Sequence, residues 1–437
     1  MLVQFSVGNF RSFKEPVTLS MVAAKIIGKN AEIDSNNIFK VNDNLDLLTS
    51  AGIYGANASG KSNLIKAFGF MHWFVLNSSR ESQADESIKI DPFLLDAEYE
   101  HKPSFFEIVF IQNSIMYRYG FEVTQKKVET EWLFYTPKNK EAKLFTRVGD
   151  DIQISRNYEG DPAAKRLTRS NALFLSVAAQ FNSETSIKVL DWFRSANAIS
   201  GYEEAGYPGF TANKYVEDQE FQKRILTLVR NADVGIENLI AEKKDINDPS
   251  VFPKDMPEEI RNIIRKEMKD KGTLITLKST HRKKTDENST EEVPFSLGQE
   301  SDGTVKLFYI SGPIFDTLNR GGVLFIDEFE ARMHTMLTRK LVSLFNSRKT
   351  NPKHAQLIFA THDTNLLSND LFRRDQLWFI EKDENGASHL YSLAELKVRN
   401  DNNFENDYLS GRYGGIPVIG DLRQLFYEPE EKNRDKN

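Results

Sequence analysis

The chain has 437 residues, 40% of them hydrophobic, so it is long enough for one large domain or two to three ordinary ones with a sizeable core. It contains no cysteine, which excludes disulfides, zinc-thiolate sites and thiol catalysis and suits a reducing cytosol. The net charge of -6 neither implies nor excludes nucleic acid as a partner. No apolar run is long enough to span a bilayer, and residues 1–5 begin an alternating strand pattern instead of a signal peptide, so we expect a soluble cytoplasmic protein.

The N-terminal part predicts strands followed by a helix. Residues 2–10 and 17–22 are short β-prone runs, and 47–54 is a third run that ends where glycines begin. After Lys61, apolar residues recur at the spacing of an amphipathic helix. These apolar positions are Leu64, Ile65, Ala67, Phe68, Met71, Phe74 and Val75. The predicted order is therefore strand, glycine loop, helix.

The glycine loop, "GANASGKS" at 55–62, fits the pattern G-x-x-x-x-G-K-[ST]. In this pattern glycines such as Gly55 and Gly60 let backbone N–H groups wrap a phosphate chain, Lys61 reaches the β and γ oxygens, and Ser62 offers its hydroxyl to Mg²⁺. A chance glycine turn is the alternative, and the strand before and the helix after the loop argue against it. Further predicted nucleotide contacts are Asn57, Ser59 and Asn63.

The middle of the chain divides into a β-rich and a helix-rich region. Residues 105–136 contain three β-prone runs with polar turns, which predicts an antiparallel meander. Helical patterns follow, for instance at 163–180 and 257–271, without a sustained heptad, so a long coiled coil is disfavoured. The stretch 279–292 is polar and charged, and we predict a locally disordered loop that splits the chain.

Two neighbouring carboxylates follow an apolar strand in "VLFIDEFE", residues 323–330. Asp327 at the strand tip is placed to hold Mg²⁺, and Glu328 is placed to act as general base on an attacking water. An acidic turn after an ordinary buried strand is the alternative. The predicted helix at 331–347 and strand at 356–360 indicate parallel strands in this region.

The strand at 356–360 leads into Thr361-His362-Asp363. A lone histidine is more often structural than catalytic. In a parallel sheet, however, His362 emerges at the same edge as Asp327, within reach of a γ-phosphate, so we predict a catalytic role. Two further strands at 377–382 and 389–393 flank Asn385-Gly386, which favours a type I′ hairpin, and the tail after Phe426 is charged and expected to fray.

The segment "SLGQESDGTVKLF", residues 296–308, contains Ser301-Asp302-Gly303-Thr304. These residues form either an ordinary helix N-cap or a helix start that grips a phosphate. Their place between the glycine loop and the Asp-Glu strand favours the phosphate grip, which assigns Ser301 and Gly303 to nucleotide binding.

In this order, the glycine loop, the Ser-x-Gly signature, the Asp-Glu strand and Thr-His-Asp resemble the ABC-type ATPase head of the SMC, RecF and OLD-like groups. "VGNFRSFKEPVTLSMVA" near the N-terminus and "YLSGRYGGIP" at 408–417 are similar to one branch, the stand-alone bacterial AAA ATPases of the RloA and abortive-infection kind. The resemblance covers nearly the whole chain. By this analogy Arg11 contacts phosphate; a surface arginine in a turn is the equal alternative. The glutamine-loop residue is unassigned, with Gln83 and Gln112 as candidates.

The resemblance also shows two departures. The signature has Ser-Asp-Gly-Thr where relatives usually have Ser-Gly-Gly-Gln or Ser-Gly-Gly-Glu, which implies a weaker grip on the γ-phosphate. After the Asp-Glu pair, Arg332 and Met333, in the segment Ala331-Arg332-Met333-His334, replace the small and apolar residues of the usual Ser-Leu-His-Pro segment. Coupling between two nucleotide sites is therefore open to question.

The resemblance implies an α/β fold, an ABC-type P-loop ATPase head with a mixed or parallel central sheet, an antiparallel β subdomain and a mainly helical insertion. We predict residues 1–156 as the N-terminal half of the head, 157–292 as the insertion, 293–426 as the C-terminal half and 427–437 as a charged tail. It further implies ATP and Mg²⁺ as ligands and a homodimer or higher homo-oligomer that shares its ATP sites.

Three functions remain open for such a dimer. The first is a regulator of a bacterial antiphage or toxin-like defence system that controls a co-encoded effector, such as a toprim-type nuclease. The second is a DNA-repair clamp of the RecF or SMC kind, which the absent coiled coil and the acidic balance disfavour. The third is a transporter motor, the least supported, because no membrane segment is visible.

Overall fold

The computed structural model describes most of the chain. It covers residues 1–80, 83, 86–202, 206–232, 235–248, 252, 256–267, 273–285, 290–417 and 420–422. None of the helices formed by these residues is long and apolar enough to cross a membrane.

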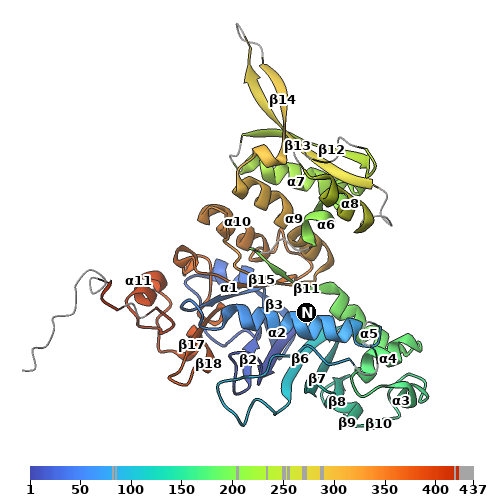
Figure 1. The fold of residues 1–437 in the computed structure, drawn as a ribbon. Coiled ribbons are helices and arrows are strands. Elements are labelled where there is room, and N and C mark those ends of the chain that lie inside the picture. The colour runs from blue at the N-terminus through green and yellow to red at the C-terminus, as the bar shows by residue number, and fades with distance from the viewer. Residues whose placement is uncertain are drawn as a thin grey trace, which may run out of the picture.

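Two large sheets form the body of the molecule (Figure 1). The first is antiparallel, in the order β10 (Asp151–Ile154), β9 (Ala142–Val148), β8 (Val128–Thr136), β7 (Ile115–Val123), β6 (Ser104–Gln112), β1 (Leu2–Gly8) and β2 (Val17–Ser20). The second is mixed, in the order β11 (Ala196–Ser200), β15 (Val323–Asp327), β16 (Gln356–Ala360), β5 (Ser50–Tyr54), β17 (Leu377–Lys382) and β18 (Ser388–Ser392). All its neighbours are parallel except β17 and β18. The predicted meander and parallel strands are confirmed.

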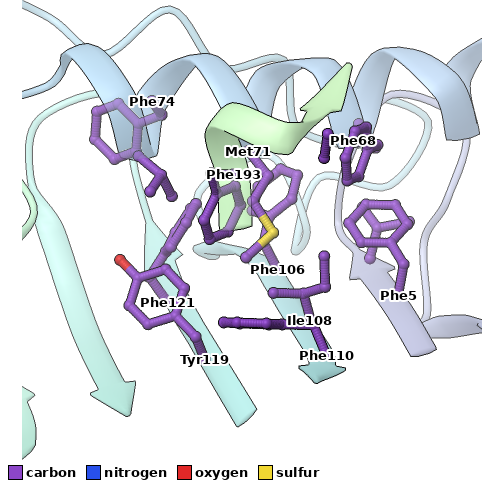
Figure 2. Packing of buried hydrophobic residues seen from close by; sticks show 14 of the residues in the cluster. Phe5, Phe68, Met71, Phe74, Phe106, Ile108, Phe110, Tyr119, Phe121 and Phe193 are labelled. Carbon is purple, nitrogen blue, oxygen red and sulfur yellow. The ribbon is translucent and has the colours of Figure 1, made fainter. Parts of the chain in front are cut away.

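Helix α2 (Lys61–Asn77) lies between the two sheets and carries the main core. Its Phe68 ring stacks on Phe325 of β15, with ring centroids 3.9 Å apart, and meets Phe5 of β1 edge-on at 5.6 Å. Further along the helix, Phe74 packs against Phe121 of β7. Figure 2 shows this row of apolar side chains facing the antiparallel sheet. The apolar side chains that are spaced along α2 therefore pack against both sheets.

A smaller part projects from this body (Figure 1). It contains the antiparallel strands β12 (Ile236–Asp245), β13 (Thr273–Lys284) and β14 (Thr290–Ser296), with helices α6 (Tyr207–Glu217), α7 (Gln219–Asn231) and α8 (Glu258–Glu267). Helix α9 (Asp302–Arg320) packs against α6 and α7 and also contacts β15, so it joins the projecting part to the mixed sheet.

The remaining elements are short. They are α1 (Ala31–Asn37), the hairpin of β3 (Ile38–Asn42) and β4 (Leu45–Leu48), α3 (Ala164–Leu167), α4 (Phe174–Gln180), α5 (Glu184–Ser195), α10 (Thr335–Phe345) and α11 (Phe404–Leu409). Residues 157–292 thus contain the predicted helices and also strands β11, β12 and β13. The domain boundaries given above remain a prediction.

The prediction of a disordered loop at 279–292 was wrong for the described residues. Residues 279–284 and 290–292 belong to the paired strands β13 and β14, in which Arg282 lies opposite Glu292 and Lys283 opposite Glu291; residues 286–289 lie outside the description. Because the hairpin projects from the body, polar side chains occupy both of its faces and hide the period-two pattern. Opposite charges across the strands stabilise the pairing instead.

The helix predicted at 163–180 is interrupted. It divides into α3 and α4, because the buried guanidinium of Arg147 takes the carbonyl oxygens of Arg169 and Ala172, at 3.1 and 2.6 Å. These carbonyls lie between the two helices and so cannot serve a continuous helical ladder. The strand predicted at 47–54 is likewise divided, into β4 and β5, which belong to different sheets.

Two further predictions needed correction. The helix predicted at 331–347 begins only at Thr335, since Arg332 has a φ of 64°, outside the helical range. The hairpin after β17 is not type I′, because Gly386 has a positive φ and Asn385 does not. It is a longer loop over 383–387. The predicted helix at 257–271 is present as α8; residues 268–272 and the predicted tail after Phe426 lie outside the description.

We expect Phe68→Ala to lower the free energy of unfolding by about 3–5 kcal/mol, because it leaves a cavity between both sheets. Urea unfolding measures the loss. Trp73→Ala is a matched control on the same helix, since Trp73 is 40% exposed, and should cost less than about 1 kcal/mol. Equal losses in the two variants would show that α2 is not the centre of the core.

Candidate functional site

The glycine loop joins β5 to α2 in a tightly packed backbone. Gly55 has a φ of 155°, and a Cβ there would lie 2.3 Å from the carbonyl oxygen of Ile380. Gly60 has a φ of 122°, and a Cβ there would lie 2.5 Å from Ser388 Oγ. Both positions therefore require glycine. No side chain caps the start of α2, so its first N–H groups are directed at the loop opening, where an anion would bind.

Lys61 lies inside this loop. Its Nζ donates hydrogen bonds to the carbonyl oxygens of Gly55 and Ala56, at 2.7 and 2.9 Å. Burial lowers the pKa of Lys61 to about 8, against the opposing effect of nearby carboxylates, of which Asp327 is the strongest. The ammonium is thus poorly solvated and held where the β and γ oxygens of a nucleotide would lie.

The other loop residues differ in their surroundings. Asn57 is exposed at the loop tip, whereas Ser59 is buried and its Oγ has no hydrogen-bond partner among the described residues. Asn63 donates to Ser12 Oγ at 2.8 Å, which ties the first turn of α2 to the turn that carries Arg11. An orphaned hydroxyl inside the loop fits a site that receives a polar ligand.

Ser62 and Asp327 form a pair of hard oxygen donors. Ser62 Oγ donates to Asp327 Oδ1 at 3.1 Å, and Asp327 is buried as the last residue of β15. The described residues contain no group of three or more histidine, aspartate or glutamate side chains that could hold a metal alone. One carboxylate and one hydroxyl fit Mg²⁺, which usually takes its other ligands from water and substrate phosphates.

Glu328 directly follows Asp327 and has an unusual backbone conformation, with a φ of 50°. Burial raises the pKa of its carboxyl group, and the charges of Asp327 and Glu330 raise it further. Glu328, Asp327 and Ser62 line one cavity of about 450 Å³ beside α2. A carboxyl group with a raised pKa at this place is suited to accept a proton from water.

His362 follows β16 at the same edge, as the parallel sheet predicts. Its backbone N–H donates to Glu330 Oε1 at 2.6 Å, while Glu330 Oε2 is buried without a hydrogen-bond partner among the described residues. Partial burial, and then the Lys61 charge, lower the pKa of the His362 imidazole. Sequence reasoning missed Glu330, although it stands in the quoted "VLFIDEFE"; its alignment with His362 depends on the neighbouring strand.

Arg11 belongs to the cavity of about 450 Å³ beside α2. It has a φ of 51°, its guanidinium pairs with Asp91 at 2.9 Å, and it lines the cavity with Ser62 and Glu328. The candidate glutamines do not line this cavity. The residue in register with Asp327 on the adjoining strand is Ser200, which sequence reasoning did not identify.

Ser301 and Gly303 are not brought to this cavity. Ser301 is the N-cap of α9, where its Oγ accepts the N–H of Thr304 at 3.2 Å. Gly303 packs closely on the turn that follows β15, where a Cβ on Gly303 would lie 2.6 Å from the Arg332 carbonyl oxygen. Neither residue lines the 450 Å³ cavity or the one of about 320 Å³ on the other side of the glycine loop.

The segment 408–417 packs beside the first residues of the glycine loop. The sequence did not predict this contact. Tyr408 and Pro417 line the smaller cavity together with Gly55 and His362. Tyr408 Oη donates to the carbonyl oxygen of Gly415 at 2.9 Å, which holds this segment in place. The "YLSGRYGGIP" stretch therefore forms part of the wall of the site.

A glycine loop between β5 and α2, a carboxylate pair after β15 and a histidine after β16 define a P-loop ATPase head of the ABC type. The chain belongs to the family described as "AAA domain, putative AbiEii toxin, Type IV TA system", whose model matches residues 50–368. No curated protein matches the chain.

Solved structures similar to this chain include three of low sequence identity. The SMC head domain from Thermotoga maritima is 15% identical, covers 91% of this chain and 99% of its own, and has a TM-score of 0.40. The SMC head bound to the C-winged helix domain of ScpA is 11% identical over 90% and 97%, with a TM-score of 0.38. The recombination mediator RecF with ATP is 12% identical over 90% and 99%, with a TM-score of 0.30.

We expect Lys61→Ala to weaken ATP binding at least about 100-fold, because charge-assisted hydrogen bonds to the phosphate chain are lost. Equilibrium titration with a fluorescent ATP analogue measures the affinity. Lys40→Ala, an exposed lysine on β3 that lines neither cavity beside the loop, is the control and should bind within a few-fold of the unaltered protein. Unchanged affinity in Lys61→Ala would exclude the loop as the phosphate site.

Proposed function

We propose that the protein is an Mg²⁺-dependent ATPase that dimerises around ATP and regulates a bacterial antiphage or toxin-like defence system through a partner effector. The observation that carries this proposal is the separation of the two nucleotide-binding elements. Lys61, Ser62, Asp327 and Glu328 come together at one place, whereas Ser301, at the start of α9, lines neither cavity beside the loop. In one chain the glycine loop and the predicted signature thus lie apart. A second copy would bring its signature to the glycine loop of the first and so complete the site.

The chain's own residues account for binding and for activation of water. The loop N–H groups and Lys61 hold the phosphates, and Ser62 and Asp327 would hold Mg²⁺, which neutralises charge on the phosphate oxygens. Glu328 takes the proton of the attacking water, and His362 contacts the γ-phosphate from the neighbouring strand. ATP closes the dimer and hydrolysis opens it, so the nucleotide controls shape.

The family supports the defence role, because its description names a putative toxin of a toxin–antitoxin system. The effector we propose is a co-encoded protein such as a toprim-type nuclease. Co-purification of the tagged chain with the product of its neighbouring gene, with and without ATP, tests this role. A nucleotide-dependent complex supports the regulator. Salt-sensitive binding to DNA, with no such complex, would instead indicate a DNA-repair ATPase.

We expect Glu328→Gln to bind ATP but to hydrolyse it about 10²- to 10⁴-fold more slowly, since the amide cannot accept the proton of the water. Steady-state phosphate release measures turnover, and light scattering after gel filtration should show accumulated closed dimers. Glu259→Gln, on the exposed face of α8, is the control. Near-normal turnover in Glu328→Gln would remove Glu328 from the role of base.

The shared site predicts that two inactive variants complement each other. Lys61→Ala lacks the loop cation and Ser301→Arg blocks the phosphate grip, so each homodimer should be inactive. A mixed dimer retains one site, built from the intact loop of one chain and the intact signature of the other. With random pairing and independent sites, about a quarter of the ATPase activity should return.

Two differently tagged variants, co-expressed and purified through both tags, provide the verified mixed dimer for this measurement. Every purified mixed dimer keeps one intact site of two, so about half of the ATPase activity is expected on it, and hydrolysis and ATP-dependent closure are measured on it directly. If neither returns, the arrangement across two chains is wrong, and Ser301-Asp302-Gly303-Thr304 is an ordinary helix cap.

A further inference from the structure

A lysine is fully buried in the helix that begins at the signature. Lys306 lies on α9, five residues after Ser301, and its exposed fraction is 0%. Its Nζ donates hydrogen bonds to the carbonyl oxygen of Gly201 and to Tyr207 Oη, the latter at 2.5 Å. The ammonium also lies 5.1 Å from the centre of the Tyr207 ring. Three separate segments therefore meet at one buried cation.

Gly201 in turn contacts the backbone of the two catalytic carboxylates. It follows β11, whose Ser200 is in register with Asp327, and its N–H donates to the Asp327 carbonyl oxygen at 2.6 Å. A Cβ on Gly201 would lie 2.0 Å from the carbonyl oxygen of Glu328. The peptide that Lys306 holds therefore packs directly on the turn that aims Asp327 and Glu328.

The first turn of α9 contacts the other end of the same turn. Gly303 packs on the carbonyl oxygen of Arg332, as its 2.6 Å approach shows. Glu328 and Arg332 both have positive φ values, 50° and 64°, which non-glycine residues adopt only when their surroundings hold them. Helix α9 thus supports the carboxylate turn at its end through Gly303 and at its beginning through Lys306 and Gly201.

We propose that Lys306 is a positioning residue for hydrolysis, which holds Gly201 against Asp327 and Glu328 and so links the start of α9 to the catalytic carboxylates. This inference rests on the proposed ATPase function. A packing role alone does not require a lysine, because a buried ammonium carries a desolvation penalty that a methionine of similar length avoids. What the ammonium adds is a charge-assisted hydrogen bond to one particular carbonyl group.

The link also joins the two sites of the proposed dimer. Ser301, five residues before Lys306 on the same helix start, would grip the nucleotide bound to the partner chain, while Gly201 supports the carboxylates of its own chain. A shift of α9 when Ser301 binds the partner's nucleotide would therefore move the turn that carries Asp327 and Glu328. Lys306→Met should uncouple the position of α9 from the position of these carboxylates.

The test compares Lys306→Met and Tyr207→Phe with Thr317→Val, a nearly isosteric control at a buried site further along α9. In Lys306→Met, kcat should fall at least 10-fold, while the ATP dissociation constant and KM stay within about 3-fold. Tyr207→Phe removes the hydroxyl but keeps the ring, so kcat should fall by a smaller factor and its folding is not at risk. Thr317→Val should retain kcat.

Hydrogen exchange of nucleotide-free protein provides a readout that does not depend on activity. The Gly201 amide should exchange at least 10-fold faster in Lys306→Met and be unchanged in Thr317→Val. Unchanged kcat and unchanged Gly201 exchange in both Lys306→Met and Tyr207→Phe would overturn the role of Lys306, even if the unaltered protein is a normal ATPase. So would equal losses in kcat and ATP affinity. Altered Gly201 exchange in a protein that does not hydrolyse ATP would instead refute the proposed function and leave the contact standing.

Discussion

The parallel pairing of β11, β15, β16 and β5 is the constraint on which the site depends. Because these strands run in one direction, their carboxyl ends meet at one edge of the sheet, which is where α/β proteins bind ligands. Lys61 follows β5, Asp327 ends β15 and His362 follows β16, so residues far apart in sequence become neighbours. Gln356 fixes this sheet to the antiparallel one, since its buried amide bonds to the main chain of β1. The strand that leads to His362 is thereby anchored to the antiparallel sheet.

The charges at this edge explain why nucleotide binding would depend on metal. Lys61 lies close to Asp327, Glu328 and Glu330, and repulsion among these carboxylates contributes to the raised pKa of Glu328. A triphosphate brings several more negative charges into this cluster. Its binding is opposed unless Mg²⁺ neutralises part of that charge beside Ser62 and Asp327. In the proposed mechanism, the same repulsion that disfavours a bare nucleotide would make Glu328 a better base.

The sequence was sufficient for those parts of the site that depend on local patterns. The glycine loop, the Asp327-Glu328 pair, and the strand and helix that flank the loop follow from residues close together in the chain. Glu330 and Ser200 could not be found this way, because their importance comes from contacts with a neighbouring strand that only the fold establishes. Gln112 was a candidate by residue type alone, and it lies at the hairpin end of β6, away from the cavity.

Helix α9 connects the projecting strands to the edge of the mixed sheet that carries Asp327 and Glu328. Glu300, directly before the N-cap Ser301, accepts hydrogen bonds from Ser279 and, at 2.6 Å, pairs with His281, both on β13. One turn and a half later, Lys306 reaches Gly201 beside the carboxylates. A force on the β13–β14 hairpin would therefore reach the start of α9, where we predict the signature, before the glycine loop. Binding of a partner at the hairpin would in this way alter hydrolysis more than nucleotide affinity, because Lys61 and its loop are held by β17 and β18 instead.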